Sequence, residues 1–433
     1  MRRAAWLLVL AGCAAPEPLS LREFEIREER FAPPRAGAVD VARMIREKRE
    51  LTLDDVLAIV DVLNPQLESE RKNVDLATAA LWDARLYPNP SLVAGIEDIR
   101  TGDPLSKSKR TIGVQVPVVV GGRIGAATSA AAKQREVAAV NYVWRRREIL
   151  GAAKLAFVTL LASKRRADLA RETRDIARGL HDATQERYKV QAVPEMELLK
   201  AAVNLAKAES DLVFAEKDLA VARTTLLAAM GDAELPVEKF TGELTTKFTV
   251  PGIDVLRGEI TTHPLVEAAV KMKEAAELER DAAKAERIPD LAVEARIGDD
   301  DGSGALLEMG LQVPLPIFNR NQGKIAASEI RIRQAELALQ AVRVELSRRL
   351  DEVHRTLVAS QKRVTVYETE IVPKAQKALD LTNEGYKLGK FGYLDVLDAQ
   401  RTLAEAKFSF VAAVVDLNAS AVELEKLTGT RLK

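Results

Sequence analysis

Two long stretches of the chain carry an apolar residue at every seventh position. The series are Leu198, Leu205, Leu212, Leu219 and Leu226, and then Val396, Leu403, Phe410, Leu417 and Leu424. A seven-residue apolar repeat makes helices wrap around one another in a left-handed supercoil. Small residues between the first five, namely Ala201, Ala202, Ala206 and Ala208, would let neighbouring helices approach closely. The pattern therefore predicts helix-on-helix packing along a rod rather than an ordinary core contact.

These two series belong to an internal duplication with an offset of roughly 198 residues. Short segments of the first half return in the same order in the second half. Asn64-Pro65 returns as His263-Pro264, Pro90-Ser91-Leu92 as Pro289-Asp290-Leu291, Gly113-Val114-Gln115-Val116-Pro117 as Gly310-Leu311-Gln312-Val313-Pro314, Thr184-Gln185-Glu186-Arg187-Tyr188-Lys189 as Thr382-Asn383-Glu384-Gly385-Tyr386-Lys387, and Gly231 as Gly429. A repeat of this kind indicates that one folding unit occurs twice.

Each repeat also contains a stretch in which apolar and polar positions alternate, which is typical of half-buried strands. In the first repeat two strands within about 91–118 flank a loop at 101–110 that is rich in Gly, Asp, Pro, Ser and Lys. In the second repeat two strands within about 290–313 flank the loop 299–304. The sequence therefore predicts one β-hairpin in each repeat.

Long helices are predicted on both sides of each β-hairpin. Their approximate bounds are 53–86, 123–188 and a return helix to 230 in the first repeat, and 258–286, 322–387 and 394–428 in the second. Pro88 and Pro90 stop the first helix, because proline cannot continue one. The domain organisation that follows is a first repeat at 51–231, a linker at 232–257 and a second repeat at 258–433.

The composition excludes several classes of function. Charged residues make up 30% of the chain and aromatic residues 4%, which suits long, surface-rich helices better than a thick globular core. Lys and Arg together number 64, as do Asp and Glu, so no excess of positive charge points to nucleic acid. The three histidines, His181, His263 and His354, lack neighbours at ligand spacing and are expected to be solvated or to cap helices. We therefore expect no enzymatic activity, no metal site and no cofactor.

The N-terminus resembles a bacterial lipoprotein signal. Basic Arg2 and Arg3 precede a short apolar run that ends in Leu10-Ala11-Gly12-Cys13. Such a run is a secretory signal and is too short to span a bilayer as a helix. We expect residues 1–12 to be a signal peptide, Cys13 to carry lipid and 13–50 to be a linker. An ordinary cysteine within a cleaved signal is the alternative.

The four predicted strands have one apolar and one polar face, and one chain has too few of them to close a membrane barrel. An open sheet edge in lipid leaves backbone groups unpaired, so only closed barrels span. Three chains would supply twelve strands and room for a lumen. Five polar positions would then line water: Gln115, Glu294, Arg296, Glu308 and Gln312. The alternative is a pair of soluble β-hairpins that cap a coiled coil. Nowhere after the signal does the sequence contain an apolar stretch long enough for a transmembrane helix.

Three junction motifs carry a resemblance to a known family. They are Leu86-Tyr87-Pro88-Asn89-Pro90, Val120-Gly121-Gly122-Arg123, and Val313-Pro314-Leu315-Pro316-Ile317-Phe318-Asn319-Arg320-Asn321-Gln322-Gly323. With them, about 50–430 resembles the TolC-like outer-membrane efflux proteins, most closely those of the cobalt–zinc–cadmium efflux type. The resemblance implies a mainly α fold of duplicated helical hairpins, assembled as a homotrimer with a 12-stranded outer-membrane β-barrel and a long periplasmic portion. It also implies a periplasmic membrane-fusion adaptor and an inner-membrane pump of the resistance-nodulation-division type as partners.

The segment Tyr386–Gln400 resembles the periplasmic tip of that family. The resemblance implies that Asp395 and Asp398 form acidic rings at a constricted pore, with Tyr386 as a latch residue. Carboxylates three residues apart share one helix face, and rings of them favour cations. The alternative is that both are first-turn acids that complement the helix dipole. The family's latch arginine is replaced here by Phe391, so an ionic latch at that position is impossible.

The turns of the two long hairpins are the candidate adaptor-docking tips. The residues are Tyr188, Val190 and Pro194 at the first tip, and Gly389 and Gly392 at the second. The function expected is an outer-membrane channel of a tripartite efflux system, which gives substrates, heavy-metal cations among them, passive passage. A lipid-anchored periplasmic coiled-coil scaffold or adaptor is the alternative from another class. Drug efflux and type I secretion remain open within the conduit class.

Overall fold

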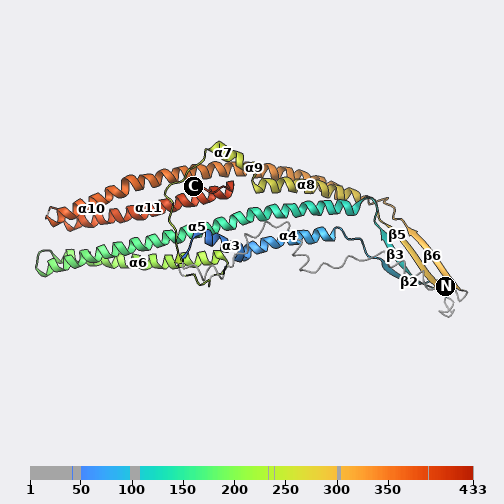
Figure 1. Cartoon of the computed structure of the whole chain (residues 1–433), viewed down its shortest axis with the longest axis horizontal. Helices are drawn as coiled ribbons and strands as arrows, with labels where there is room; N and C mark the ends of the chain where they lie inside the picture. Colours follow the sequence, from blue (N-terminus) through green and yellow to red (C-terminus); the bar gives the residue numbers. More distant parts are fainter. Residues whose placement is uncertain are drawn as a thin grey trace.

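The computed structural model describes residues 41, 50–97, 108–232, 234–237, 239–299, 304–388 and 390–432. The molecule is elongated, with a sheet at one end and the turns of two helical hairpins at the other (Figure 1). The predicted lipidation residue Cys13, the tip residue Gly389, the predicted signal and nearly all of the linker 13–50 lie outside the described residues. Among the described residues, no helix is both long and apolar enough to cross a membrane.

The described part of the first half contains four helices and two strands of the main sheet. In order they are α3 (Leu53–Leu63), α4 (Pro65–Asp83), β2 (Ser91–Glu97), β3 (Lys109–Val118), α5 (Arg123–Lys189) and α6 (Glu195–Met230). The expectation of one helix over 53–86 was wrong, because the helix is interrupted at Asn64. There the Asn64 side chain accepts hydrogen bonds from the N–H groups of Gln66 and Leu67 and caps a new helix that starts at Pro65.

The second half repeats this order. Its elements are α7 (Ile253–Ile260), α8 (Pro264–Ala285), β5 (Leu291–Asp299), β6 (Ala305–Gln312), α9 (Gln322–Val366), the π-helical turn η2 (Tyr367–Ile371), α10 (Val372–Lys387) and α11 (Tyr393–Thr428). The predicted single helix 258–286 is likewise broken, at His263-Pro264. The capping role expected for a histidine is met there, because His263 Nδ1 accepts the N–H of Leu265 at 3.1 Å.

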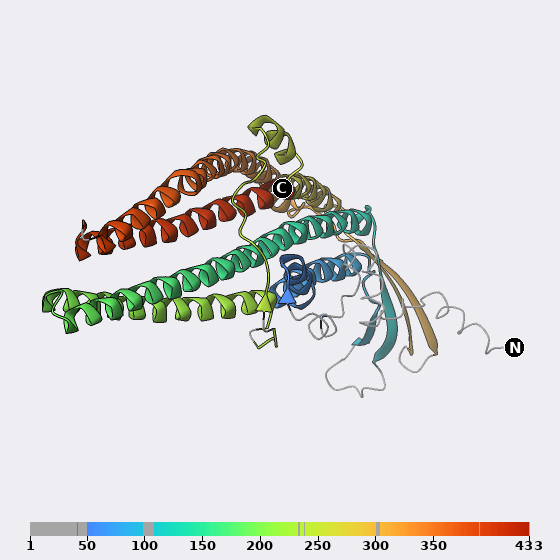
Figure 2. The same cartoon turned by 60° about the vertical axis from the view of Figure 1, so that its left-hand side comes forward.

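The heptad positions lie where the supercoil pattern placed them. Leu226, Leu417 and Leu424 are fully buried, and none of the ten positions is exposed. Ala201 and Ala208 are buried as well, whereas Ala202 and Ala206 face solvent in the single chain, so only half of those alanines bring helices together within it. The helices α5 and α6 therefore form one packed hairpin, and α9, α10 and α11 form the other (Figure 2).

The segment between the halves is more than a linker. It contains β4 (Lys239–Phe240), which pairs in parallel with β1 (Glu50–Leu51), and it includes the start of α7. Beyond β4 the chain crosses both hairpins (Figure 2). Asn418 Nδ2 donates to the Thr245 carbonyl at 2.8 Å, and the Phe248 N–H donates to Gln361 Oε1 at 3.1 Å. These bonds attach the crossing segment to the second hairpin.

The four strands of the two halves form one antiparallel sheet in the order β2-β3-β5-β6. Because β3 pairs directly with β5, the two predicted hairpins are joined side by side. In the described chain β2 and β6 each pair on one side only, so both edges of this sheet are open. The register places Ile112 opposite Ile297 and Val114 opposite Ala295, so the apolar positions share one face.

Candidate functional site

The polar face of the sheet is the first candidate site. Cross-strand neighbours share a face, so the register gathers the five predicted lumen residues, Gln115, Glu294, Arg296, Glu308 and Gln312, on the face opposite the apolar one. Gln115 Nε2 donates to Gln312 Oε1 at 3.2 Å across the intervening strand. The structure thus brings all five together on one face of the sheet.

Two further charged residues on this face were missed by the sequence analysis. Lys109 forms ion pairs with Glu308 and with Glu97, whose Oε2 lies 3.8 Å from its Nζ. Arg296 pairs with Glu294 and, at 3.4 Å, with Glu97. The alternation of the strands was an available signal, because residues two positions apart lie on the same face. Lys109 therefore shares a face with Thr111, and Glu97 shares one with Gly95.

The tip between α10 and α11 is the second candidate site. Asp395 and Asp398 are both exposed on the first turns of α11. The Gly392 N–H donates to Asp395 Oδ2 at 2.8 Å, so this carboxylate caps its own helix. The contact leaves Asp395 exposed, so it decides between neither the pore ring nor the helix-dipole role.

Phe391 occupies the position at which the resemblance leads one to expect arginine. Its ring lies directly on Gly385, where an added Cβ would come within 2.1 Å of Phe391 Cδ2. The Lys390 N–H donates to the Gly385 carbonyl at 2.8 Å and tightens the same turn. Phe391 therefore packs within its own tip.

The first tip presents exposed side chains at its turn. Val190 is 75% exposed and Tyr188 38% exposed, and Pro194 precedes the first residue of α6. Gln191 adopts a left-handed conformation with φ of 57°, and its N–H donates to the Tyr188 carbonyl at 2.8 Å. The docking candidates of this tip thus lie on one compact turn.

The two tips also touch each other within one chain. The guanidinium of Arg187 lies 4.9 Å from the centroid of the Tyr386 ring. Tyr393 is 2% exposed, and its hydroxyl has no hydrogen-bond partner in the described part of the chain. Burial, with the nearby Tyr386 and Glu197, raises the pKa of Tyr393. Neither Arg187 nor Tyr393 was predicted, because both contacts depend on how the two hairpins sit side by side.

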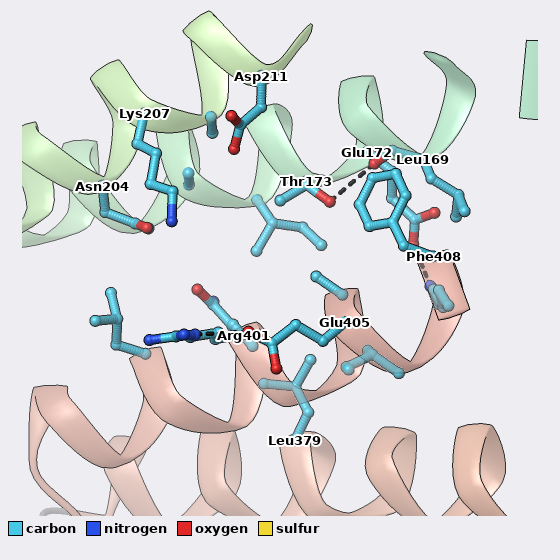
Figure 3. A pocket seen from close by; sticks show the side chains of 18 of the residues that line it. Leu169, Glu172, Thr173, Asn204, Lys207, Asp211, Leu379, Arg401, Glu405 and Phe408 are labelled. Carbon is cyan, nitrogen blue, oxygen red and sulfur yellow. Dashed lines mark hydrogen bonds and ion pairs between the residues drawn. The ribbon is translucent and has the colours of Figure 1, made fainter. Parts of the chain in front are cut away.

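A groove of about 580 Å³ runs between the two hairpins behind the tips. Figure 3 shows Leu169 and Thr173 on one wall and Leu379, Arg401 and Phe408 on the other. The ion pair between Lys407 and Glu172, at 2.7 Å, joins the walls at one end. Both apolar and charged side chains line the groove, among them Leu379, Lys207 and Arg401. Amphipathic helices bind to grooves that offer an apolar surface.

Metal ligands do not gather at either candidate site. In the described ranges no group of three or more His, Cys, Asp or Glu residues could hold a metal ion. At the polar face of the sheet and at the second tip, the described residues instead present fixed charges.

Comparison with known proteins decides the family. The profile of the family described as outer membrane efflux protein matches residues 60–232 and 259–430, which is most of the chain. The chain belongs to this family. The outer membrane efflux protein described here is 31% identical over 390 residues to the cobalt-zinc-cadmium resistance protein CzcC of Cupriavidus metallidurans, covering 88% of this chain and 90% of that protein. The nickel and cobalt resistance protein CnrC of the same species is 32% identical over 292 residues, covering 65% of this chain and 68% of that one.

Solved structures have the same fold as this outer membrane efflux protein. The outer membrane protein VceC of Vibrio cholerae superposes with a TM-score of 0.72 at 19% identity, covering 88% of this chain and 96% of that one. A membrane protein of Pseudomonas aeruginosa superposes with a TM-score of 0.74 at 18% identity, covering 88% and 90%. The mainly α fold with duplicated helical hairpins and four strands is therefore confirmed.

Proposed function

We propose that this chain is the outer-membrane channel of a tripartite efflux system and exports heavy-metal cations. The observation that carries the proposal is the exposed apolar face of the sheet. Large side chains from all four strands stand on it, including Leu92 (75% exposed), Leu307 (67%) and Met309 (78%). A soluble protein rarely exposes so continuous an apolar surface, whereas a lipid-facing wall requires it.

The open edges of the sheet support assembly from three copies. Strands β2 and β6 each have one free edge in the described chain, and unpaired backbone groups in lipid cost several kcal/mol each. If β6 of one copy pairs with β2 of the next, three copies give the closed barrel of twelve strands, with Gln115, Glu294, Arg296, Glu308 and Gln312 facing the lumen. Exposed Tyr87 and Phe318, where the chain enters and leaves the sheet, suit the interface of a bilayer.

The long hairpins would then continue the tube into the periplasm. Asp395, Asp398 and Tyr386 are the proposed constriction at its far end. Tyr188, Val190, Pro194, Gly389 and Gly392 are the proposed contacts of a membrane-fusion adaptor, and the groove in Figure 3 would accept one of its helices. A resistance-nodulation-division pump in the inner membrane completes the system, and lipid on Cys13 would anchor each copy.

The coiled-coil scaffold is the weaker alternative. A scaffold has no use for a sheet with one exposed apolar face, and the apolar faces of its two β-hairpins would not need to coincide. Within the conduit class, similarity to the cobalt-zinc-cadmium resistance protein CzcC and the nickel and cobalt resistance protein CnrC favours metal cations over drugs or secreted proteins.

Export can be tested in a Gram-negative host that lacks the gene. We expect the deletion strain to accumulate cobalt, zinc or cadmium, and the full-length gene to restore normal content. A matched variant, Asp398→Lys, places a cation at the constriction and should fail to restore export while still reaching the outer membrane. Normal metal content in the deletion strain would contradict the metal assignment.

A further inference from the structure

Five charged side chains on the polar face of the sheet form one connected set, which we call the charge row. Its members are Glu97 of β2, Lys109 of β3, Glu294 and Arg296 of β5, and Glu308 of β6. Every strand contributes, so the set crosses the whole width of the sheet. Both cations pair with Glu97, and each has a second carboxylate of its own.

Small residues beneath the charge row keep these side chains flat against the sheet. Arg296 on β5 reaches Glu97 on β2 across the intervening strand β3. At Gly113 on β3 an added Cβ would lie 2.6 Å from Arg296 Cγ, and at Gly95 it would lie 3.8 Å from Arg296 Nη1. The guanidinium thus crosses β3 above a bare backbone, and a larger residue at Gly113 would displace it.

The charges of the row do not balance. Three carboxylates face two cations, which leaves one negative charge per chain on this face among the described residues. Three copies around one lumen would repeat that excess three times. Fixed charges that line a narrow passage raise the local concentration of ions of opposite sign.

We propose that the charge row is a determinant of ion selectivity in the strand region, separate from the tip aspartates, and that Lys109 and Arg296 set its strength. The row favours cations because each chain contributes three carboxylates and only two cationic side chains to it. This inference rests on the proposed function, since it requires that the polar face lines the passage.

Reversal potentials in planar bilayers with a potassium chloride gradient test the proposal on the purified full-length protein. Arg296→Gln and Lys109→Gln each remove one cation per chain. Each should raise the potassium-to-chloride permeability ratio at least about fourfold, since a unit charge at ~10 Å in water changes the local concentrations of potassium and chloride about twofold each, in opposite directions. Glu97→Gln should lower the ratio by about the same factor. The charge-preserving variants Arg296→Lys and Lys109→Arg should leave it unchanged.

Two controls separate this row from other charges. Asp299→Asn removes a carboxylate from the opposite face of β5 and should not alter the ratio. Each glutamine variant should change the permeability ratio in the same direction with and without the tip charges, which Asp395→Asn and Asp398→Asn remove. If the wild type conducts but no charge substitution in the row changes the potassium-to-chloride permeability ratio, this inference alone would be overturned. A wild type without conductance would instead overturn the proposed function.

Discussion

Arg187 in the first hairpin places its guanidinium 4.9 Å from the ring of Tyr386 in the second. The contact joins two tips that are separated by nearly two hundred residues in sequence. Phe391 stands where the family resemblance implies a latch arginine, and Phe391 packs on Gly385. Arg187 and Tyr386 therefore form a contact between the two hairpins at this end of the molecule.

We predict that Arg187→Gln loosens this end of the tube. A cation–π contact at an exposed site contributes about 0.5–1 kcal/mol, so its loss should shift the balance of closed and open states by roughly two- to fivefold. Single-channel recording should show a matching rise in open probability. Arg178→Gln is the matched control, because Arg178 pairs with Glu209 inside the first hairpin, at 2.8 Å. Equal behaviour of the two variants would contradict this role of Arg187.

The two functions of Asp395 can be separated. Asp395→Asn removes the charge but still accepts the Gly392 N–H, whereas Asp395→Ala removes both charge and cap. We expect both variants to lower cation selectivity equally. Only Asp395→Ala should also lose about 1 kcal/mol of stability, measured as a lower Tm. Unchanged selectivity in both would reduce Asp395 to a helix cap.

The joint at His263 predicts a dependence of stability on pH. The imidazole is 2% exposed and lies 4.8 Å from the ring of Trp144. Burial, followed by the charge of Arg147, lowers the pKa of His263 to about 4. The folded-state pKa therefore lies below the unfolded value near 6.5, so the unfolded state binds the extra proton between these values. The contribution of neutral His263 to the free energy of unfolding is fully present above about pH 6.5. It falls by about 3 kcal/mol as the pH drops toward 4.

The matched variant for this prediction is His263→Asn. Asparagine stands at the equivalent joint in the first repeat, where Asn64 caps α4 and also donates to the Ala229 carbonyl at 2.8 Å. It keeps the cap and removes the titrating group. Between pH 4 and 7 the Tm of the variant should depend less on pH than the Tm of the wild type. An identical pH dependence of the two would exclude His263 as the cause.

A backbone prediction concerns Gln191, whose φ of 57° lies in the left-handed region. A residue with a Cβ is disfavoured there by about 1 kcal/mol relative to glycine. Gln191→Gly should therefore raise the Tm. Ala192→Gly, one position later, should leave it equal or lower, because glycine only adds freedom to the unfolded chain there. A lower Tm for Gln191→Gly would contradict the claim that the backbone at Gln191 is strained.

The strongly periodic elements could be predicted from the sequence, and the reason is local. Seven-residue and two-residue apolar repeats record which side of a helix or strand is buried, so the long helices and the four strands were placed within a few residues. The breaks at Asn64 and His263 were missed because an amphipathic pattern continues through both, and only the capping side chains and the following prolines interrupt it.

Contacts between distant segments could not be predicted in the same way. The pairing of β1 with β4 involves two residues on each strand, too few for a periodic signal. The alternation within each strand places Glu97 and Lys109 on the polar face, but their ion-pair partners follow only from the register of the four strands. Arg187 and Tyr393 depend on the packing of one hairpin against the other, which no local pattern encodes.

Native mass spectrometry of the protein released from outer membranes in mild detergent tests the central claim most directly. The account requires that neighbouring copies supply the strands that one sheet lacks. It predicts a particle with the mass of three chains, which persists at low protein concentration. A stable particle with the mass of one chain would contradict it.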